Sequence, residues 1–248
     1  MAAATQVFPA PGRCLQWMEA HGLTRSQAVT RVDGESRWSS ALRRCFDIGF
    51  AGMAIVLLAP VLVAVAVAVR LDSRGSALFR QRRVGFHERE FTLYKFRSMR
   101  LDADPRGHQQ YVTALINGGA DAEQAPDGGK DLYKLAVDNR ITSVGRWIRK
   151  WSLDELPQLF NVVLGHMTLV GPRPAIPYEV AEYPTWYLER FKVKPGLTGY
   201  WQVSGRSERT YEEMVRLDIE YAERRSLGLD LSILIKTPWI VLTRKGAE

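Results

Sequence analysis

Residues 48–69 read IGFAGMAIVLLAPVLVAVAVAV and contain no charged side chain. A straight helix over this run extends ~33 Å, against a bilayer hydrocarbon core of ~30 Å. The run begins far from the first residue, and residues 1–40 contain no apolar region, so it does not resemble a cleaved signal peptide. The alternative is a buried core helix, although apolar runs in such helices are usually shorter. We therefore expect a membrane helix within residues 41–72.

Two features of this segment bear on how it enters the membrane. Pro60 lies near its middle, where it removes a helical hydrogen bond and forces a kink. Arginines flank both ends, namely Arg43, Arg44, Arg70, Arg74, Arg80, Arg82 and Arg83. The positive-inside tendency then places both flanks in the cytoplasm. This pattern favours a re-entrant helix that bends at Pro60 and returns over a single span.

The composition of the chain sets broad limits. Lys and Arg number 34 against 27 Asp and Glu, a formal net charge of +7 that suits nucleic acid, anionic lipid or a phosphate-rich substrate equally. The length allows one sizeable core. Cys14 and Cys45 are far apart and the four histidines stand singly. We expect no disulfide framework and no zinc site, and a reducing cytoplasm as the compartment.

The remaining sequence predicts a mixed fold. Strand-like residues 77–81 and 91–96, with Gly85 between them, predict a β-hairpin. Residues 102–130 are rich in Gly and Asp and indicate a long loop or insertion. Helical periodicity is found at 143–151, 154–165, 176–191 and 209–225. We expect a helix-rich α+β fold: an extension over residues 1–40, then the Pro-kinked re-entrant membrane helix, then a small globular cytoplasmic catalytic domain over residues 73–248.

Two stretches combine aromatic and basic side chains. One holds Tyr183, Trp186, Tyr187 and Phe191 close to Arg190, Lys192 and Lys194. The other covers residues 231–242, contains Trp239, and is followed by Arg244 and Lys245. Such stretches suit interfacial amphipathic helices at a bilayer surface, or ordinary amphipathic helices packed on a core. The sequence leaves both interpretations open.

Asp154 and Glu155 are adjacent carboxylates at the expected start of a helix. One interpretation is structural: Ser152 caps the helix and Glu155 completes a capping box, although Pro157 would then delete a helical bond. If Asp154 is itself the cap, Pro157 falls where its missing N–H costs nothing. Either register places both carboxylates at a positive helix end, which also attracts phosphate. An ionised Asp is a nucleophile toward phosphorus, and a neighbouring Glu can hold Mg²⁺.

Phosphate chemistry also requires cations. The candidates are Lys95, Arg97, Arg173 and Arg206. Arg173 is the most telling, because Pro172 and Pro174 would stiffen its loop and fix the direction of its guanidinium. For any one of these cations, the alternative is a solvated surface charge.

Seven motifs follow one another over about four-fifths of the chain. They are Arg-Cys-Phe-Asp ending at Asp47, Phe79–Gly85, Tyr94–Met99, Ser152–Gln158, Leu169–Pro174, Lys194–Gly199 and Trp201–Arg206. In this order the chain resembles the bacterial sugar transferases, the monotopic polyprenol-phosphate phosphoglycosyl transferases, and in particular members that transfer hexose 1-phosphates. It departs at Ala59, where members often carry Ser before the kinking proline.

The resemblance implies a transferase on the cytoplasmic face of the bacterial inner membrane. Asp154 would attack the β-phosphate of a UDP-sugar, release UMP and hold the phosphosugar covalently until undecaprenyl phosphate accepts it. The donor sugar would be a hexose, glucose or galactose. The reaction would be the first membrane step of exopolysaccharide, lipopolysaccharide O-antigen or glycoprotein glycan assembly.

The resemblance also assigns roles to residues. Glu155 would help to hold Mg²⁺, Pro172–Pro174 and Arg206 would position the substrate, and Lys95, Arg97 and Gln158 fall in matching blocks as substrate-binding positions. Anionic membrane lipids are expected partners. A homodimer and contacts with downstream glycosyltransferases are left open.

Parts of the sequence also suit three rival functions. The charge and residues 80–83 suit a nucleic-acid-binding protein, but no recognised motif is present and we expect no nucleic-acid partner. A catalytically silent membrane scaffold for glycan enzymes would not need Asp154. A two-carboxylate glycosidase is disfavoured, because its carboxyl groups must flank the scissile bond ~5–9.5 Å apart.

Overall fold

The computed structural model describes residues 37–100, 140–205 and 210–243, with residues 109, 112–113 and 115–116 between them. Its elements in chain order are α2 (Arg37–Asp72), β1 (Leu78–Val84), η1 (Phe86–Glu88), β2 (Glu90–Phe96), α4 (Ser143–Lys150), η3 (Leu153–Glu155), α5 (Gln158–Leu164), β3 (Thr168–Val170), α6 (Pro177–Ala181), η4 (Thr185–Lys192), β4 (Gly196–Thr198), η5 (Trp201–Val203), α7 (Tyr211–Arg224) and α8 (Leu227–Thr243). The η elements are short 3₁₀ helices. The predicted helix-rich α+β composition is confirmed.

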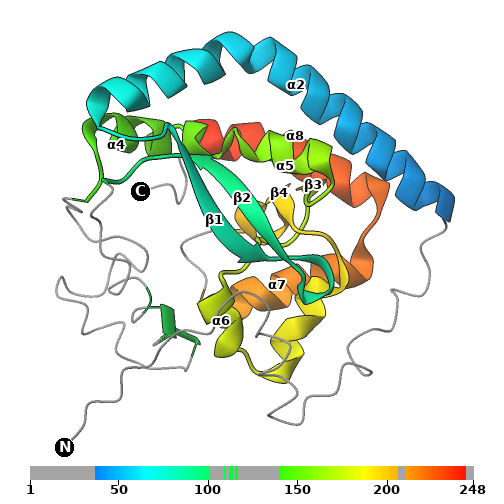
Figure 1. Cartoon of the computed structure of the whole chain (residues 1–248). Helices are drawn as coiled ribbons and strands as arrows, with labels where there is room; N and C mark the ends of the chain where they lie inside the picture. The colour runs from blue at the N-terminus through cyan, green and yellow to red at the C-terminus, as the bar shows by residue number, and fades with distance from the viewer. Residues whose placement is uncertain are drawn as a thin grey trace, which may run out of the picture.

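The long helix α2 arches over the rest of the domain, across α4 and α5 (Figure 1), and Pro60 lies inside it without ending it. The helix is buried near its two ends, at Arg43, Asp47 and Ala51 and again at Val65 and Val69, and the residues between Ala51 and Val65 are partly or fully exposed. An apolar stripe of the helix is exposed, at Met53, Val56, Leu57, Val63, Val67 and Leu71. Within the described ranges, this is the one helix long and apolar enough to cross a membrane.

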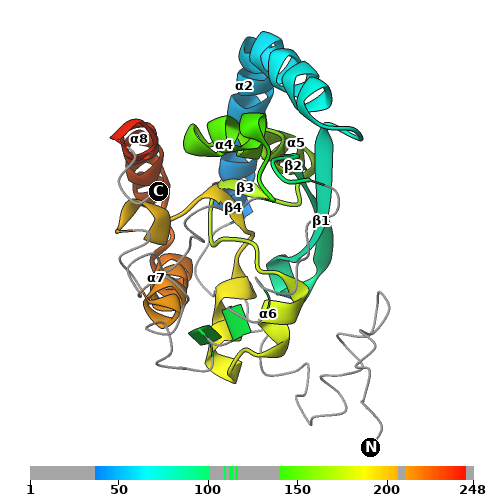
Figure 2. The same cartoon turned by 90° about the vertical axis from the view of Figure 1, so that its left-hand side faces the viewer.

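The predicted β-hairpin is present and is longer than its sequence signals. Strands β1 and β2 pair antiparallel from Leu78 opposite Phe96 to Val84 opposite Glu90. Figure 2 shows the hairpin along one side of the domain and α8 along the other. Because side chains alternate along a strand, Lys95 of β2 and Arg83 of β1 lie on the same face of the hairpin.

A second pair of strands was not predicted. β3 and β4 are parallel, with Thr168 opposite Gly196 and Val170 opposite Thr198. The close approach requires glycine at position 171, where a Cβ atom would lie 2.4 Å from the carbonyl oxygen of Lys194. This small parallel sheet lies in the main core, which joins Leu93, Leu159, Val162, Met167, Leu169, Tyr221 and Ile233.

Two of the predicted helices have different limits. The helix expected at 154–165 begins only at Gln158, after a 3₁₀ turn and Pro157. The helix expected at 176–191 is divided into α6 and η4, because Pro184 adopts an extended conformation between them. The helices expected at 143–151 and 209–225 are confirmed as α4 and α7.

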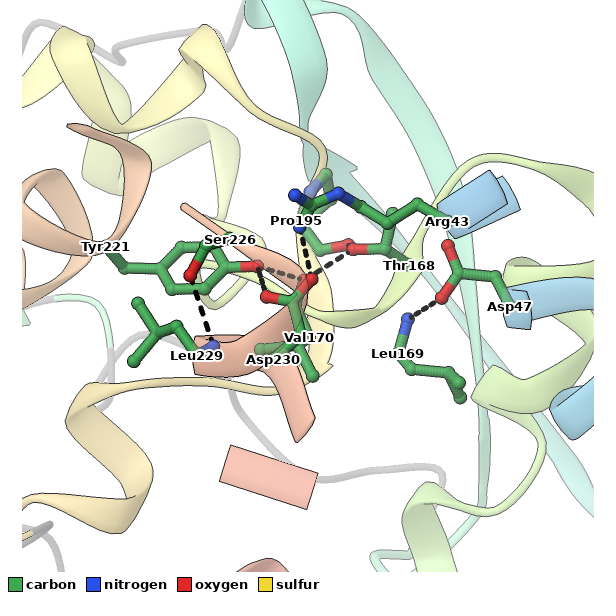
Figure 3. Close-up of polar contacts among 10 residues, drawn as sticks. All are labelled: Arg43, Asp47, Thr168, Leu169, Val170, Pro195, Tyr221, Ser226, Leu229 and Asp230. Carbon is green, nitrogen blue, oxygen red and sulfur yellow. Dashed lines mark hydrogen bonds and ion pairs between the residues drawn. The ribbon is translucent and has the colours of Figure 1, made fainter. Parts of the chain in front are cut away.

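The start of α2 is joined to the domain by buried polar contacts (Figure 3). Arg43 forms an ion pair with Asp230 of α8, and the Tyr221 hydroxyl donates to Asp230 Oδ1 at 2.7 Å. Asp47 Oδ1 accepts a hydrogen bond from the backbone N–H of Leu169 in β3, at 3.0 Å. These contacts lock the first turns of α2 to β3 and α8.

The far end of α2 is also fixed to the domain. Arg97, just after β2, donates to the carbonyl oxygens of Ser73 and Arg74, each at 2.6 Å. Val65 and Val69 pack there against Phe96 and other apolar residues. The domain therefore holds both ends of the one long apolar helix.

The two stretches that combine aromatic and basic side chains differ in how far they are buried. In the first stretch Tyr187, Arg190 and Phe191 are buried and Trp186 is 38% exposed, which favours packing on a core over the interfacial interpretation. On α8, Leu231 and Ile235 are exposed and Trp239 is 70% exposed. Only the second stretch therefore presents an apolar surface.

Candidate active site

The two adjacent carboxylates lie in a tight turn in front of α5. After α4 the chain passes through Ser152 in a left-handed conformation (φ 53°), forms η3, and reaches Pro157 before α5 begins. Among the described residues no side-chain hydrogen bond from Ser152 caps this turn, so the capping-box interpretation is wrong. Asp154 is not the helix cap either, because Pro157 occupies that position. A non-glycine residue held at positive φ is a strained feature often found at functional sites.

A lysine from the hairpin reaches this turn. Lys95 Nζ lies 2.9 Å from Glu155 Oε1, and the two side chains are 23% and 36% exposed. The pair is therefore open to solvent on one side and can be approached by a substrate. The structure thus brings Lys95 close to Asp154 and Glu155. A phosphate site requires a cation beside such carboxylates, and Lys95 was one of the predicted candidates.

Asp154 is the more enclosed of the two carboxylates, at 9% exposed. Burial raises its pKa to about 6; the charges of Lys95 and Arg149 oppose that shift, and the negative charge of Glu155 adds to it. At neutral pH Asp154 is mainly ionised but poorly solvated. A desolvated carboxylate with such a pKa is suited to nucleophilic attack.

One buried amide fixes the hairpin against α5. Asn161 Oδ1 accepts from the backbone N–H of Tyr94 at 3.0 Å, and Asn161 Nδ2 donates to the carbonyl of Thr92 at 2.7 Å. These bonds join β2 to the helix that follows the carboxylates. Asn161 therefore sets the register in which Lys95 meets Glu155.

The proline-flanked loop after β3 is held through its backbone. The carbonyl of Pro172 accepts from the N–H of Gly196 at 2.9 Å, and the carbonyl of Pro174 accepts from Arg83 Nη1 at 2.9 Å. Pro172 and Pro174 are buried, whereas Arg173 between them is partly exposed. The loop is thus rigid and presents a single cation.

Arg83 is a functional candidate that the sequence analysis did not single out. It is buried, and burial followed by repulsion from Arg173 lowers its pKa to about 10, whereas Glu179, Tyr178 and Glu155 act in the opposite direction. Arg83 therefore interacts electrostatically with both the Arg173 loop and the carboxylate turn. Arg83 lies in the Phe79–Gly85 motif and on the same face of the hairpin as Lys95, and these two features could have identified it from the sequence.

The other predicted site residues are placed differently. Arg97 is buried and donates hydrogen bonds to the backbone at the end of α2, so the structure does not bring it to the carboxylates. Gln158 is buried as the first residue of α5. Pro60 lies exposed in the middle of α2. Arg206 lies outside the described residues.

The carboxylate oxygens of Asp154 and Glu155 are possible ligands for a metal ion. The described part of the chain contains no group of three or more His, Cys, Asp or Glu side chains that could hold a metal ion. Mg²⁺ needs fewer protein ligands, because it usually takes one or two carboxylates with water and substrate phosphates. Asp154 and Glu155 supply oxygen ligands of that kind, so they fit Mg²⁺ delivered with a phosphorylated substrate.

Comparison with known proteins assigns the class. Residues 38–244 match the model of the family described as bacterial sugar transferase. The chain belongs to that family, and the resemblance drawn from the motifs is confirmed. The family is one of transferases, and the matched range includes the carboxylate turn and the Arg173 loop.

Individual relatives are similar over most of this chain. An undecaprenyl-phosphate galactose phosphotransferase of Salmonella typhimurium is 42% identical over 211 residues, 85% of this chain and 42% of its own length. An undecaprenyl-phosphate glucose phosphotransferase of Komagataeibacter xylinus is 39% identical over 82% of this chain and 36% of its own length. The exopolysaccharide production protein ExoY of Rhizobium meliloti is 36% identical over 82% of this chain and 86% of its own length. The chain thus spans less than half of the first two relatives and most of the third.

Proposed function

We propose that the protein transfers a hexose 1-phosphate from a UDP-sugar to undecaprenyl phosphate and releases UMP. The observation that carries the proposal is the turn in which the enclosed Asp154 lies beside the Lys95–Glu155 pair. Two relatives are named as undecaprenyl-phosphate phosphotransferases, one for galactose and one for glucose, which supports a hexose and this lipid acceptor.

The first step is a displacement at phosphorus. An Asp154 oxygen forms a bond to the β-phosphorus of the donor, the bond from that phosphorus to the bridging oxygen breaks, and UMP leaves with the bonding electrons. Lys95 and Arg173 offset the negative charge that gathers on the transferring group. Glu155 would hold a Mg²⁺ ion, and that ion would neutralise further negative charge on the diphosphate of the donor.

The second step returns the enzyme to its starting state. An oxygen of undecaprenyl phosphate attacks the phosphorus of the aspartyl-phosphosugar, and Asp154 leaves as a carboxylate. The product is undecaprenyl diphosphate sugar. Dividing the transfer into two displacements at one carboxylate lets two bulky substrates use the same open turn in succession.

The same proposal includes a monotopic placement on the cytoplasmic face of the inner membrane. A helix that crossed the bilayer could not keep both ends against one domain on one side, yet α2 contacts the domain near Asp47 and again near Val69. A re-entrant path, with the exposed apolar stripe of α2 in one leaflet, accommodates both contacts. The exposed side chains of α8 would rest at the same surface.

Cysteine labelling tests this placement. Cys45 is exposed near the start of α2, and Ser76→Cys places a thiol just beyond its end; Cys14 is replaced to remove its signal. An impermeant maleimide should label both positions in inverted membrane vesicles and neither in intact spheroplasts. Labelling of the two positions from opposite sides would establish a single span and reject the re-entrant path.

The reaction is tested with protein purified in detergent, Mg²⁺, undecaprenyl phosphate and a panel of UDP-sugars. UMP release with one or two hexose donors, lost in Asp154→Asn and retained in the surface change Glu220→Gln, is the expected result. Phosphosugar trapped on the protein without the lipid acceptor would identify the covalent step. A folded protein that releases UMP from no donor would favour the scaffold function instead.

A further inference from the structure

We propose that Arg190 and Asp218 are positioning residues that hold the backbone of Arg173, and thereby fix where its guanidinium meets the phosphates of the donor. Arg190 comes from η4 and Asp218 from α7, and they form an ion pair with 1% and 0% of their surfaces exposed. Neither residue can touch a substrate from that depth. The inference rests on the proposed function, in which Arg173 contacts the donor.

Both backbone polar groups of Arg173 face this pair. Arg190 Nη2 donates a hydrogen bond to the carbonyl oxygen of Arg173 at 3.0 Å. The backbone N–H of Arg173 also acts on the Asp218 carboxylate, because it lowers the pKa of that carboxyl and so favours its charged form. One ion pair therefore holds a single residue of the loop from both sides.

The neighbouring residues of the loop depend on other groups. Pro172 is bound to Gly196 of β4, Pro174 to Arg83, and the carbonyl of Ala175 accepts from Val84 at 2.8 Å. Arg173 is thus the one position in this short loop whose backbone is held by Arg190 and Asp218. Disturbing the pair should move Arg173 and leave the ends of the loop in place.

A further layer orients Arg190 itself. Arg190 Nη1 donates to the hydroxyl of Tyr183 at 3.1 Å, and the hydroxyls of Tyr183 and Tyr211 are hydrogen-bonded at 2.5 Å. A planar guanidinium can serve Asp218, Tyr183 and the Arg173 carbonyl at once, whereas an ammonium group presents a compact point charge. The arrangement therefore uses a property that arginine has and lysine lacks.

Stability alone is a weak reason for this pair. Removing two charges from water is costly, and apolar residues of similar volume often replace a buried ion pair without loss. The contact with the Arg173 backbone supplies a positional reason for the charges. Small displacements of a substrate-binding group can lower rates by roughly 100-fold.

Arg190→Lys is the sharpest variant, because it keeps a cation beside Asp218 while losing the planar fork. The matched control is Arg224→Lys, at an exposed arginine paired with Glu220. Each change is made alone and together with Arg173→Ala, and thermal melting confirms that all four proteins and their parents are folded at the assay temperature.

The expected result is a fall of roughly 10- to 100-fold in kcat/KM for the UDP-sugar in Arg190→Lys. In the Arg173→Ala background the same change should have less than about a threefold further effect, because residues that act through one group are not additive. KM for undecaprenyl phosphate should not change. Equal losses in the two backgrounds would show a merely structural role and overturn the inference.

Binding of UDP, measured by calorimetry, separates this inference from the proposed function. If the unchanged protein binds UDP but releases UMP from no donor, the proposed function fails, and non-additive losses of UDP affinity still support the positioning role. Additive losses of UDP affinity overturn it. A folded protein that neither binds UDP nor releases UMP overturns both.

Discussion

Two clusters of opposite charges in the domain differ in burial and in backbone conformation. In the cluster of Arg43, Asp47 and Asp230, all three residues are buried and the carboxylates bond to arginine, tyrosine or backbone groups. In the turn of Asp154 and Glu155, the Lys95–Glu155 pair remains partly open and the backbone at Ser152 is strained. Openness together with backbone strain, more than the presence of charges, distinguishes the proposed catalytic turn from the buried cluster.

The largest expected effect comes from Asp154→Asn. UMP release should fall by on the order of 10⁴ or more, because the proposed nucleophile is lost. Burial raises the pKa of Asp154 above its unfolded value, so its ionisation reduces folding stability as pH rises through about 6, and the neutral amide removes that loss. The melting temperature at pH 7 should therefore stay the same or rise. A clear drop would place Asp154 with the structural cluster.

Asp230→Asn should have the opposite profile. It leaves Arg43 buried without its carboxylate, and breaking a buried pair costs about 3–5 kcal/mol of stability. The kcat per folded molecule should be unchanged, as measured by UMP release normalised to the folded fraction. The exposed change Glu212→Gln serves as control. A loss of kcat in fully folded Asp230→Asn would erase the distinction between the two clusters.

Removing the cation of the open cluster should lower activity to an intermediate extent. Lys95→Met is expected to reduce kcat/KM for the UDP-sugar by about 10²–10³-fold, since it removes a positive charge near the transferring phosphate. Lys95→Arg should restore part of this loss while keeping the contact with Glu155. Full activity in Lys95→Met would show that the pair with Glu155 only stabilises the turn.

The pH dependence gives a smaller effect with a defined sign. Asp154 has a pKa of about 6, so kcat/KM for the donor should rise about tenfold per pH unit below about 6 and level off above it. The charge of Lys95 lowers the pKa of Asp154, so the rise should move to higher pH in Lys95→Met. A rise that stays in place in that variant would assign the titration to another group.

The smallest effect concerns the exposed surface. Trp239→Gln removes the most exposed aromatic of α8 and should weaken membrane association by about 1–2 kcal/mol, with α2 retaining the protein in the membrane. We expect solubilisation at a lower detergent concentration. Trp186→Gln is the control, because its ring packs under Arg216 at 4.8 Å. An equal shift in both variants would show that α8 has no special contact with lipid.

The sequence predicted those features that depend on a long periodic pattern or on residues close together in the chain. The apolar run of α2, the alternation of the hairpin and the periodicity of α7 each extend over enough residues to identify the element. The adjacent carboxylates were identified by their type and spacing. In each case the deciding interaction lies within a few residues of the chain.

The errors have a common physical origin in contacts between distant residues. Lys95 and Arg97 looked equivalent, but β2 ends at Phe96, so Arg97 leaves the strand and binds the end of α2. Strands β3 and β4 are three residues each, too short for a periodic signal. The sequence left open whether the stretch around Arg190 lies at a membrane surface or packs on a core, because the partner Asp218 is 28 positions away. Local sequence patterns do not predict contacts between residues that are far apart in the chain.

The fixation of α2 at both ends has a consequence for how the enzyme meets its lipid. An enzyme on a flexible tether samples many heights above a bilayer, whereas α2, the helix proposed to enter the lipid, is part of the same packed body as the proposed catalytic turn. On that proposal Asp154 is held at one elevation, and the polyprenol phosphate must be presented at that level. A fragment beginning after Asp72 would uncover the groups that Asp47, Val65 and Val69 now cover, so α2 and the domain form one structural unit.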